Sequence, residues 1–377
     1  PTMLKRLIPL LAAMLLAVVP LAGTAQAKKD TMVIGMTLEP APGLDPTAGA
    51  ASAIAEVVLY NIFETLTKIN ADGSVTPLLA QSWEISPDLK TYTFKLRRDA
   101  KFQNGEPFNA QTVKYSFERA AADKSTNKDK RLFQTMAFIS TPDPYTVVIG
   151  MKTIEPDLLF LLGQATAIMV EPKSVETNAT KPVGTGPFML ENWAKGSSIT
   201  LVRWPQWRDA ASIKLAKVTF RFISEPAAQV ASLLAGDVDA FPRVTAARSL
   251  DQFKADGRFQ VILAGTRAKT ILAINNKKPL LNDVRVRRAL SLALDRAAIV
   301  SRVMEGAATA TVQVMPPGSF GYTPDLTVPA ADVEAARRLL AEAGYPNGFR
   351  MTLHGPNDRY PNDARIAQAA GQMWTRI

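Results

Sequence analysis

Cysteine is absent from the 377-residue sequence, and histidine occurs once, at position 354. Without cysteine the chain can form no disulfide bond, no thiolate zinc site and no cysteine nucleophile. Aromatic residues make up only 7% of the chain, whereas 47% of the residues are hydrophobic and 21% are charged. This composition is typical of a soluble globular protein, and the length suffices for two or three lobes that each bury a core.

Residue patterns for catalysis are also scarce. Ser125–Lys128 has the Ser-x-x-Lys spacing of serine acyl-enzymes, but the partner motifs are missing and the segment is a charged loop. Gly184–Gly186 resembles a phosphate-binding loop, yet Pro187 follows it and a strand, not a helix, is expected next. His354 has no sequence partner, and no pair of carboxylates stands out as a general acid and base. The sequence therefore predicts a protein that is not an enzyme and holds no cofactor and no metal.

Basic residues exceed acidic ones by 44 to 34, which gives a formal net charge of +10. Such an excess raises the question of nucleic-acid or membrane binding. The densest basic runs are 124–131 and 285–288, and neither contains the interleaved aromatic residues expected of single-strand binding. We therefore expect no nucleic-acid partner.

The first 27 residues have the order of a secretory signal. Lys5 and Arg6 precede an apolar run, 7–22, and small residues follow up to Ala27. Because the run is shorter than the roughly 20 residues that span a bilayer, an uncleaved membrane anchor is the less favoured alternative. We predict cleavage after Ala27. The signal predicts that the mature protein is periplasmic. Since the chain has no cysteine, the mature protein is not expected to be lipidated.

Hydrophobic periodicity divides the remaining chain into alternating strands and helices. Strands are expected at 32–36, 92–96, 146–151, 199–202, 218–223, 259–263, 270–274 and 351–353. Helices are expected at 51–66, 113–122, 226–234, 283–297, 332–343 and 364–377. The last of these has no stop signal before Ile377, which indicates a C-terminally truncated chain. Helices that alternate with mixed strands predict an α/β architecture with at least two lobes.

Several segments, in the same order, resemble the extracytoplasmic solute-binding proteins of ABC transporters, in the family of oligopeptide, dipeptide and nickel binders. These segments are 61–66, 72–84, 92–97, 101–108, 183–188, 235–240, 275–276, 283–290 and 294–296. Two sites depart from the family pattern. Gln103-Asn104 stands where His-Asp is usual, and 203–207 replaces an Asn-Pro-x-Tyr-Trp pattern. Both departures are expected to be structural. Trp193, Trp204 and Trp207 could form an aromatic platform, but two of the three are expected to pack in the core or between the lobes.

The resemblance implies the fold of a two-lobed periplasmic binding protein, type II-like, with an extra subdomain in the first lobe. The first lobe would comprise residues 28–266, with the inserted subdomain at about 65–175. The second lobe would comprise 267–377 and be incomplete. The crossover near 268–274 would act as a hinge, so that closure of the lobes buries the ligand and creates the form that a permease recognises.

The resemblance also implies a ligand and a site. The loop 357–365 corresponds to one that holds a ligand carboxylate in dipeptide-binding relatives, so Arg359 is the expected carboxylate contact, next to Tyr360. Asp363 is a candidate for a ligand ammonium group, and Glu39 and Tyr60 are expected to line the cleft from the first lobe. An ion pair between Arg359 and Asp358 or Asp363 is the alternative.

The expected function is that of a monomeric periplasmic component of an ABC importer. It would capture short peptides and deliver them to a permease in the inner membrane. Binding of nickel chelates, haem or opine-like solutes remains an alternative, as does a periplasmic sensor or chaperone-like role for the same clamp. Direct metal ligation is disfavoured because the chain has one histidine and no cysteine.

Overall fold

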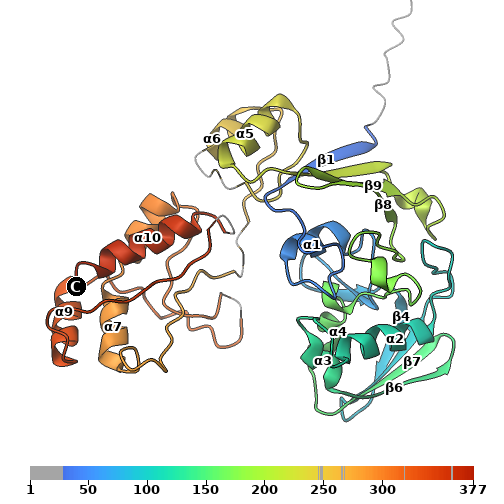
Figure 1. The fold of residues 1–377 in the computed structure, drawn as a ribbon, viewed down its shortest axis with the longest axis horizontal. Coiled ribbons are helices and arrows are strands. Elements are labelled where there is room, and N and C mark those ends of the chain that lie inside the picture. Colours follow the sequence, from blue (N-terminus) through green and yellow to red (C-terminus); the bar gives the residue numbers. More distant parts are fainter. Residues whose placement is uncertain are drawn as a thin grey trace, which may run out of the picture.

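A computed structural model of the chain describes residues 29–244, 246, 249–264, 266, 268–317, 319–357 and 360–377. The signal-peptide and cleavage predictions fall outside the described residues. The described chain forms two bodies, and helices α5 (Pro226–Ala235) and α6 (Leu250–Ala255) lie on the side of the first body where the chain crosses to the second (Figure 1).

The first body contains a four-stranded sheet whose strands come from distant parts of the sequence. The strand order is β1 (Thr31–Met36), β10 (Lys217–Phe222), β9 (Ser198–Arg203) and β8 (Phe188–Ala194). Strands β1 and β10 run parallel, and the other neighbours are antiparallel. Val218 and Phe220 alternate onto one face of the sheet, where they share a buried core with α1 (Ser52–Val58).

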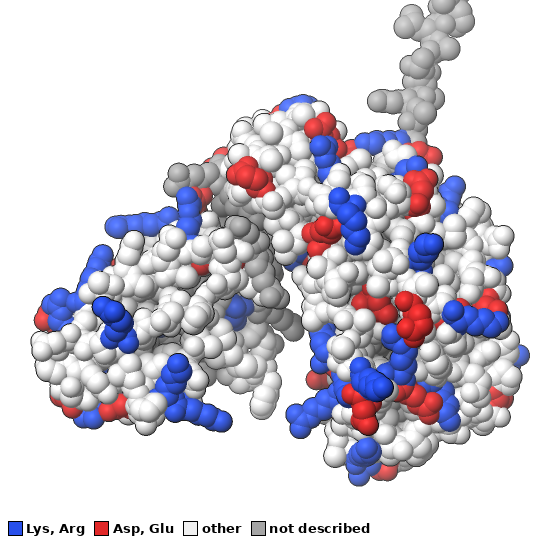
Figure 2. Space-filling view, viewed as in Figure 1, with Lys and Arg blue, Asp and Glu red and all other residues white. Residues whose placement is uncertain are grey.

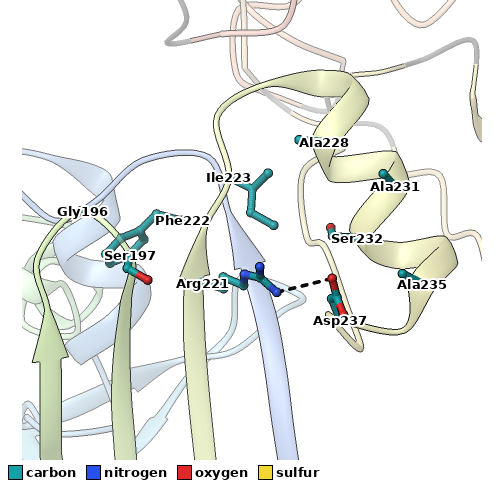
Figure 3. Close-up of a pocket in the computed structure, with 10 residues that line it drawn as sticks. All are labelled: Gly196, Ser197, Arg221, Phe222, Ile223, Ala228, Ala231, Ser232, Ala235 and Asp237. Carbon is teal, nitrogen blue, oxygen red and sulfur yellow. Dashed lines mark ion pairs between the residues drawn. The ribbon is translucent and has the colours of Figure 1, made fainter.

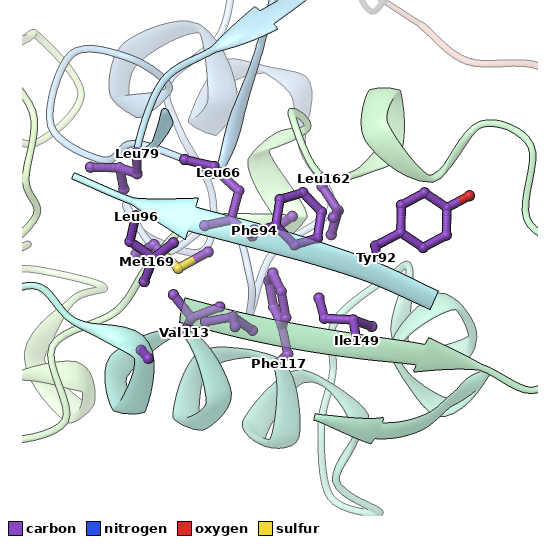
Figure 4. Packing of buried hydrophobic residues seen from close by; sticks show 14 of the residues in the cluster. Leu66, Leu79, Tyr92, Phe94, Leu96, Val113, Phe117, Ile149, Leu162 and Met169 are labelled. Atoms are coloured by element: carbon purple, nitrogen blue, oxygen red, sulfur yellow. The ribbon is translucent and has the colours of Figure 1, made fainter. Parts of the chain in front are cut away.

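A second unit of the first body lies between β1 and β8 in the sequence. Its antiparallel sheet has the order β4 (Ala80–Ile85), β5 (Thr91–Leu96), β7 (Thr146–Met151) and β6 (Met136–Asp143). The remaining elements are β2 (Thr67–Ile69), β3 (Val75–Pro77), α2 (Ala110–Ala121), α3 (Lys130–Gln134) and α4 (Leu158–Leu161). Figure 4 shows Phe94 and Ile149 of the sheet meeting Val113 and Phe117 of α2 in a buried core. We call this part the inserted unit.

The loop 184–188 joins the inserted unit to the four-stranded sheet through a close backbone approach. A Cβ atom at Gly184 would lie 1.9 Å from the Ile62 carbonyl oxygen, and one at Gly186 would lie 2.3 Å from the Asn61 carbonyl oxygen. The Gly186 N–H donates to Ile62 O at 2.8 Å, and the Phe188 N–H donates to Asn61 O at 2.9 Å. Any larger residue would break these contacts, so the two glycines serve packing.

The residues that depart from the family pattern support the same loop. The Gln103 side-chain amide donates to the carbonyl oxygens of Gly186 (3.1 Å) and Phe188 (2.7 Å). The Trp207 indole N–H donates to the Thr185 carbonyl oxygen at 3.1 Å, and Trp204 is 4% exposed. The expectation that both departures are structural agrees with these contacts.

A buried ion pair lies beside this loop. Arg208 donates to both carboxylate oxygens of Glu64, at 2.8 and 2.5 Å, and the two side chains are 7% and 2% exposed. The Arg208 guanidinium also lies 4.6 Å from the ring centroid of Trp207. Glu64 follows α1 and precedes β2, whereas Arg208 follows β9, so the pair ties the start of the inserted unit to the four-stranded sheet.

The second body is built from helices packed around a smaller core. Its helices are α7 (Val284–Leu292), α8 (Arg296–Ala298), α9 (Val333–Glu342) and α10 (Asp363–Trp374). Helix α7 packs against α9 through Val286, Leu290 and Leu340, and the Trp374 indole N–H donates to Leu290 O at 2.8 Å. Short turns complete the described chain: η1 (Ala165–Ala167), η2 (Val175–Thr177), η3 (Ala210–Ser212) and the π-helical turn η5 (Ile299–Val303).

Two expected helices end earlier than the sequence indicates. The helix expected at 51–66 ends at Val58, because Leu59 is extended and Tyr60 has a φ of 60°. Ile62 and Leu66 are nevertheless buried, although neither lies in a helix. Their four-residue spacing therefore results from burial in the core and does not indicate helical structure. The helix expected at 283–297 divides after Leu292, because Asp295 accepts the Ala298 N–H and so caps α8 separately.

Three expected strands are wrong. Segments 259–263, 270–274 and 351–353 carry no regular strand, and within the described residues no strand is paired with them. Ile262 and Ile271 are 76% and 63% exposed. An apolar, β-prone sequence forms a strand only when a neighbouring strand satisfies its backbone groups.

The Arg208–Glu64 pair leads to a stability prediction. Arg208→Met is expected to lower the free energy of unfolding by about 3–5 kcal/mol, because it leaves the Glu64 carboxylate buried without its partner. The double variant Arg208→Met/Glu64→Leu should recover most of that loss. Urea denaturation followed by circular dichroism measures both effects.

A surface pair serves as the control. Lys217 and Glu191 lie 2.8 Å apart with side chains 43% and 42% exposed, so Lys217→Met should cost only about 0–1 kcal/mol. Equal losses for Lys217→Met and Arg208→Met would contradict the structural role assigned to the buried pair.

Candidate ligand-binding site

The carboxyl edge of the four-stranded sheet is the candidate site. Because β1 and β10 are parallel, their carboxyl ends at Met36 and Phe222 lie at the same edge. The turn between β8 and β9, residues 195–197, reaches that edge too, and the Phe222 N–H donates to Ser197 O at 2.9 Å. In open α/β sheets ligands bind outside the carboxyl ends of the strands. Here this edge lies toward the second body (Figure 1), and Figure 2 shows a hollow between the two bodies.

Glu39 is held by the β8–β9 turn. It follows β1, and its Oε1 accepts the Trp193 indole N–H at 2.7 Å. The Gly196 N–H also reaches both carboxylate oxygens, at 3.0 and 3.1 Å. Gly196 has a φ of +74°, a conformation that favours glycine. The Lys195 ammonium lies over the Trp193 ring, 3.0 Å from its centroid. Glu39 therefore orients the turn that carries Lys195.

A pocket opens beside this turn, between the sheet edge and α5 (Figure 3). Its volume is about 440 Å³, and its lining is Gly196, Ser197, Arg221, Phe222, Ile223, Ala228, Ala231, Ser232, Ala235 and Asp237. Most of the lining is small or apolar. Arg221 and Asp237 supply the charges and face each other at 3.7 Å, with side chains 47% and 55% exposed.

Tyr60 is engaged with the inserted unit and not with the β8–β9 turn. Its hydroxyl donates to Gly163 O at 2.6 Å and accepts the Ile69 N–H at 2.9 Å. Burial raises the pKa of this phenol above its usual value of 10.0. The described contacts therefore do not bring Tyr60 and Glu39 together.

The expected carboxylate contact of the second body, Arg359, lies outside the described residues. Of its neighbours, Tyr360 is 54% exposed, and its N–H donates to Asp363 Oδ2 at 3.0 Å. The other Asp363 oxygen accepts the Ala364 N–H at 2.8 Å. These residues lie at the N-terminal end of α10, which is the end directed toward the first body in Figure 1.

In the part of the chain that the structure describes, no group of three or more His, Asp or Glu side chains could hold a metal ion. No helix in the same residues is long and apolar enough to cross a membrane.

Sequence reasoning missed several residues at this edge. It left Trp193 open between an aromatic platform and packing, and it gave Lys195 and Arg221 no role. Asp239, two positions after Asp237 in the sequence, pairs with Lys29 and accepts the Val33 N–H. Lys195 and Arg221 carried no sequence signal, because their position depends on strand pairing between distant segments.

The comparisons with known proteins agree with this architecture. The family model of bacterial extracellular solute-binding proteins, family 5, matches residues 74–377. The glutathione-binding protein GsiB of Salmonella choleraesuis is 30% identical over 373 residues, which cover 97% of this chain and 71% of that protein.

Solved structures give the same result. One is the periplasmic binding protein DppA of Helicobacter pylori in complex with the peptide STSA, with a TM-score of 0.81 and 25% identity, covering 91% of this chain and 72% of the other. Another is the binding protein AgaA from A. tumefacien R10 in complex with agropinic acid, with a TM-score of 0.77 and 28% identity, covering 92% and 70%.

The two-body α/β fold, with a polar sheet edge toward a hollow between the bodies, is that of a solute-binding protein of ABC importers. The chain belongs to the bacterial extracellular solute-binding proteins, family 5. Its relatives in this family bind solutes and are not enzymes.

The role of Glu39 can be tested by separating stability from binding. Glu39→Ala is expected to lower the free energy of unfolding by about 1–3 kcal/mol, because the Trp193 indole and the Gly196 N–H lose their acceptor. Glu39→Gln, which keeps one acceptor oxygen, should cost less. Urea denaturation followed by tryptophan fluorescence gives the comparison. Unchanged stability of Glu39→Ala together with lost ligand binding would instead make Glu39 a direct ligand contact.

Proposed function

We propose that the protein captures short peptides, and related small solutes that carry a carboxylate, between its two bodies and delivers them to an ABC permease in the inner membrane. The observation that carries this proposal is the similarity of 97% of the chain to a glutathione-binding protein, since glutathione is a tripeptide. The similarity to DppA in complex with the peptide STSA supports the same ligand class.

The proposal places the protein in the periplasm as a monomer, after cleavage following Ala27. Residues 28–266 form the first lobe, with the insertion at about 65–175, and residues 267–377 form the second. The separate hydrophobic cores of the four-stranded sheet, the inserted unit and the second body support this division. Closure of the lobes, with a hinge near 268–274, buries the ligand and favours recognition by the permease.

Opine-like solutes are a second ligand class. The similarity to AgaA in complex with agropinic acid favours it. Because agropinic acid, like a peptide, is a carboxylate, a guanidinium contact suits both classes.

The ligand class is tested by analysing what the protein carries. Native mass spectrometry of the purified protein, followed by denaturation, is expected to release peptides of about two to five residues. Titration calorimetry with glutathione, alanine dipeptides and mannopine-type opines then ranks the classes. A released metal chelate or tetrapyrrole, with no heat from any peptide, would overturn the proposed ligand.

The proposed carboxylate contact is tested at Arg359. Arg359→Ala should weaken peptide binding by about 1.5–3 kcal/mol, the scale of a hydrogen bond to a charged group. Arg338→Ala is the matched control, because Arg338 is exposed on α9, outside the loop 357–365, and its loss should leave the dissociation constant unchanged. Peptide affinity that is the same for Arg359→Ala and the unmodified protein would remove Arg359 from the site.

A further inference from the structure

The β8–β9 turn presents a lysine that has no ion-pair partner among the described residues. The Lys195 side chain is exposed, and its ammonium rests on the Trp193 ring face. Among the described residues, no carboxylate lies within ion-pair distance of Lys195. The other cation of this edge, Arg221, is already opposite Asp237.

The turn is also held in place before any ligand arrives. The Trp193 indole N–H and the Gly196 N–H flank Lys195 in the sequence, and both donate to Glu39. The Glu39 carboxylate is thus hydrogen-bonded to the indole N–H and the Gly196 N–H, whereas the Lys195 ammonium lies over the face of the indole ring. Fixing the aromatic platform restricts the lysine, which lowers the entropy lost when an anion binds it.

The position of the turn points to the ligand. Gly196 and Ser197, which follow Lys195, line the 440 Å³ pocket at the carboxyl edge of the sheet (Figure 3). Lys195 itself does not line this pocket; it lies on the Trp193 ring at the same carboxyl edge, which is directed toward the second body, so a ligand bound between the bodies at that edge can reach its ammonium. The proposed function assigns the terminal carboxylate of the ligand to Arg359 in the second lobe, so the Lys195 ammonium is available for a second anionic group of the same ligand.

We propose that Lys195 is a specificity-determining residue that binds a second carboxylate of the ligand, so that the protein prefers short peptides with an acidic side chain over neutral ones. This inference rests on the proposed function. Within the proposed ligands, the inference names one class: peptides that carry two carboxylates.

The test uses isosteric peptide pairs. Tripeptides of alanine that carry Glu or Gln at the first, second or third position differ in one carboxylate and keep the terminal carboxylate. Titration calorimetry of the unmodified protein is expected to show, for at least one pair, about tenfold tighter binding of the Glu peptide. Lys195→Met, which keeps an unbranched chain on Trp193, should reduce that preference to about one.

Two further variants complete the experiment. Lys195→Arg keeps the cation and should preserve the preference, and Lys90→Met, at an exposed lysine of the inserted unit, should leave it unchanged. The inference is overturned if the unmodified protein binds Glu and Gln peptides equally, or if Lys195→Met retains the preference. Failure of the unmodified protein to bind any of the six peptides would instead overturn the proposed function on which the inference rests.

Discussion

The buried ion pair between Arg208 and Glu64 is the contact on which the arrangement of the first body depends. Glu64 lies between Phe63, which belongs to the core of the four-stranded sheet, and Leu66, which belongs to the core of the inserted unit. A carboxylate that is 2% exposed is tolerated only while its partner stays in place. Because Arg208 comes from the segment after β9, the two cores cannot separate without exposing or isolating a charge. The close backbone approach at Gly184 and Gly186 fixes the same junction sterically.

That junction has a consequence at the other end of the strands. The inserted unit is anchored near the start of β8 and the end of β9. The β8–β9 turn therefore lies at the opposite edge of the sheet, where β1 and β10 end. Glu39 then joins two segments that are 154 residues apart in the chain, through the Trp193 indole. The polar groups of this edge are held together by hydrogen bonds between segments that are distant in the sequence. Their arrangement follows from the order of the strands in the sheet.

Local signals in the sequence predicted much of the fold. Strands expected at 32–36, 92–96 and 146–151 agree with β1, β5 and β7 within a residue, and the helix expected at 332–343 agrees with α9, which Asp332 caps. The errors arise where burial and periodicity coincide without regular structure, as at Ile62 and Leu66, or where a β-prone segment such as 259–263 has no paired strand among the described residues. The family motifs indicated the clamp, but the partners of Glu39 and the position of Lys195 depend on strand register. No spacing along a single sequence specifies that register.

In the proposed function, the division of the polar groups between two bodies constrains which solutes can drive closure. A ligand shifts the open–closed equilibrium only by the difference between its affinities for the two forms. A small solute bound at the sheet edge alone would contact Lys195 and the pocket equally in both forms, and would therefore not drive closure. A solute long enough to reach the N-terminal end of α10 gains contacts only when the bodies approach. On the proposed assignment, the first body selects for charge, whereas the distance between the bodies selects for length, so that the two requirements act on different parts of one ligand.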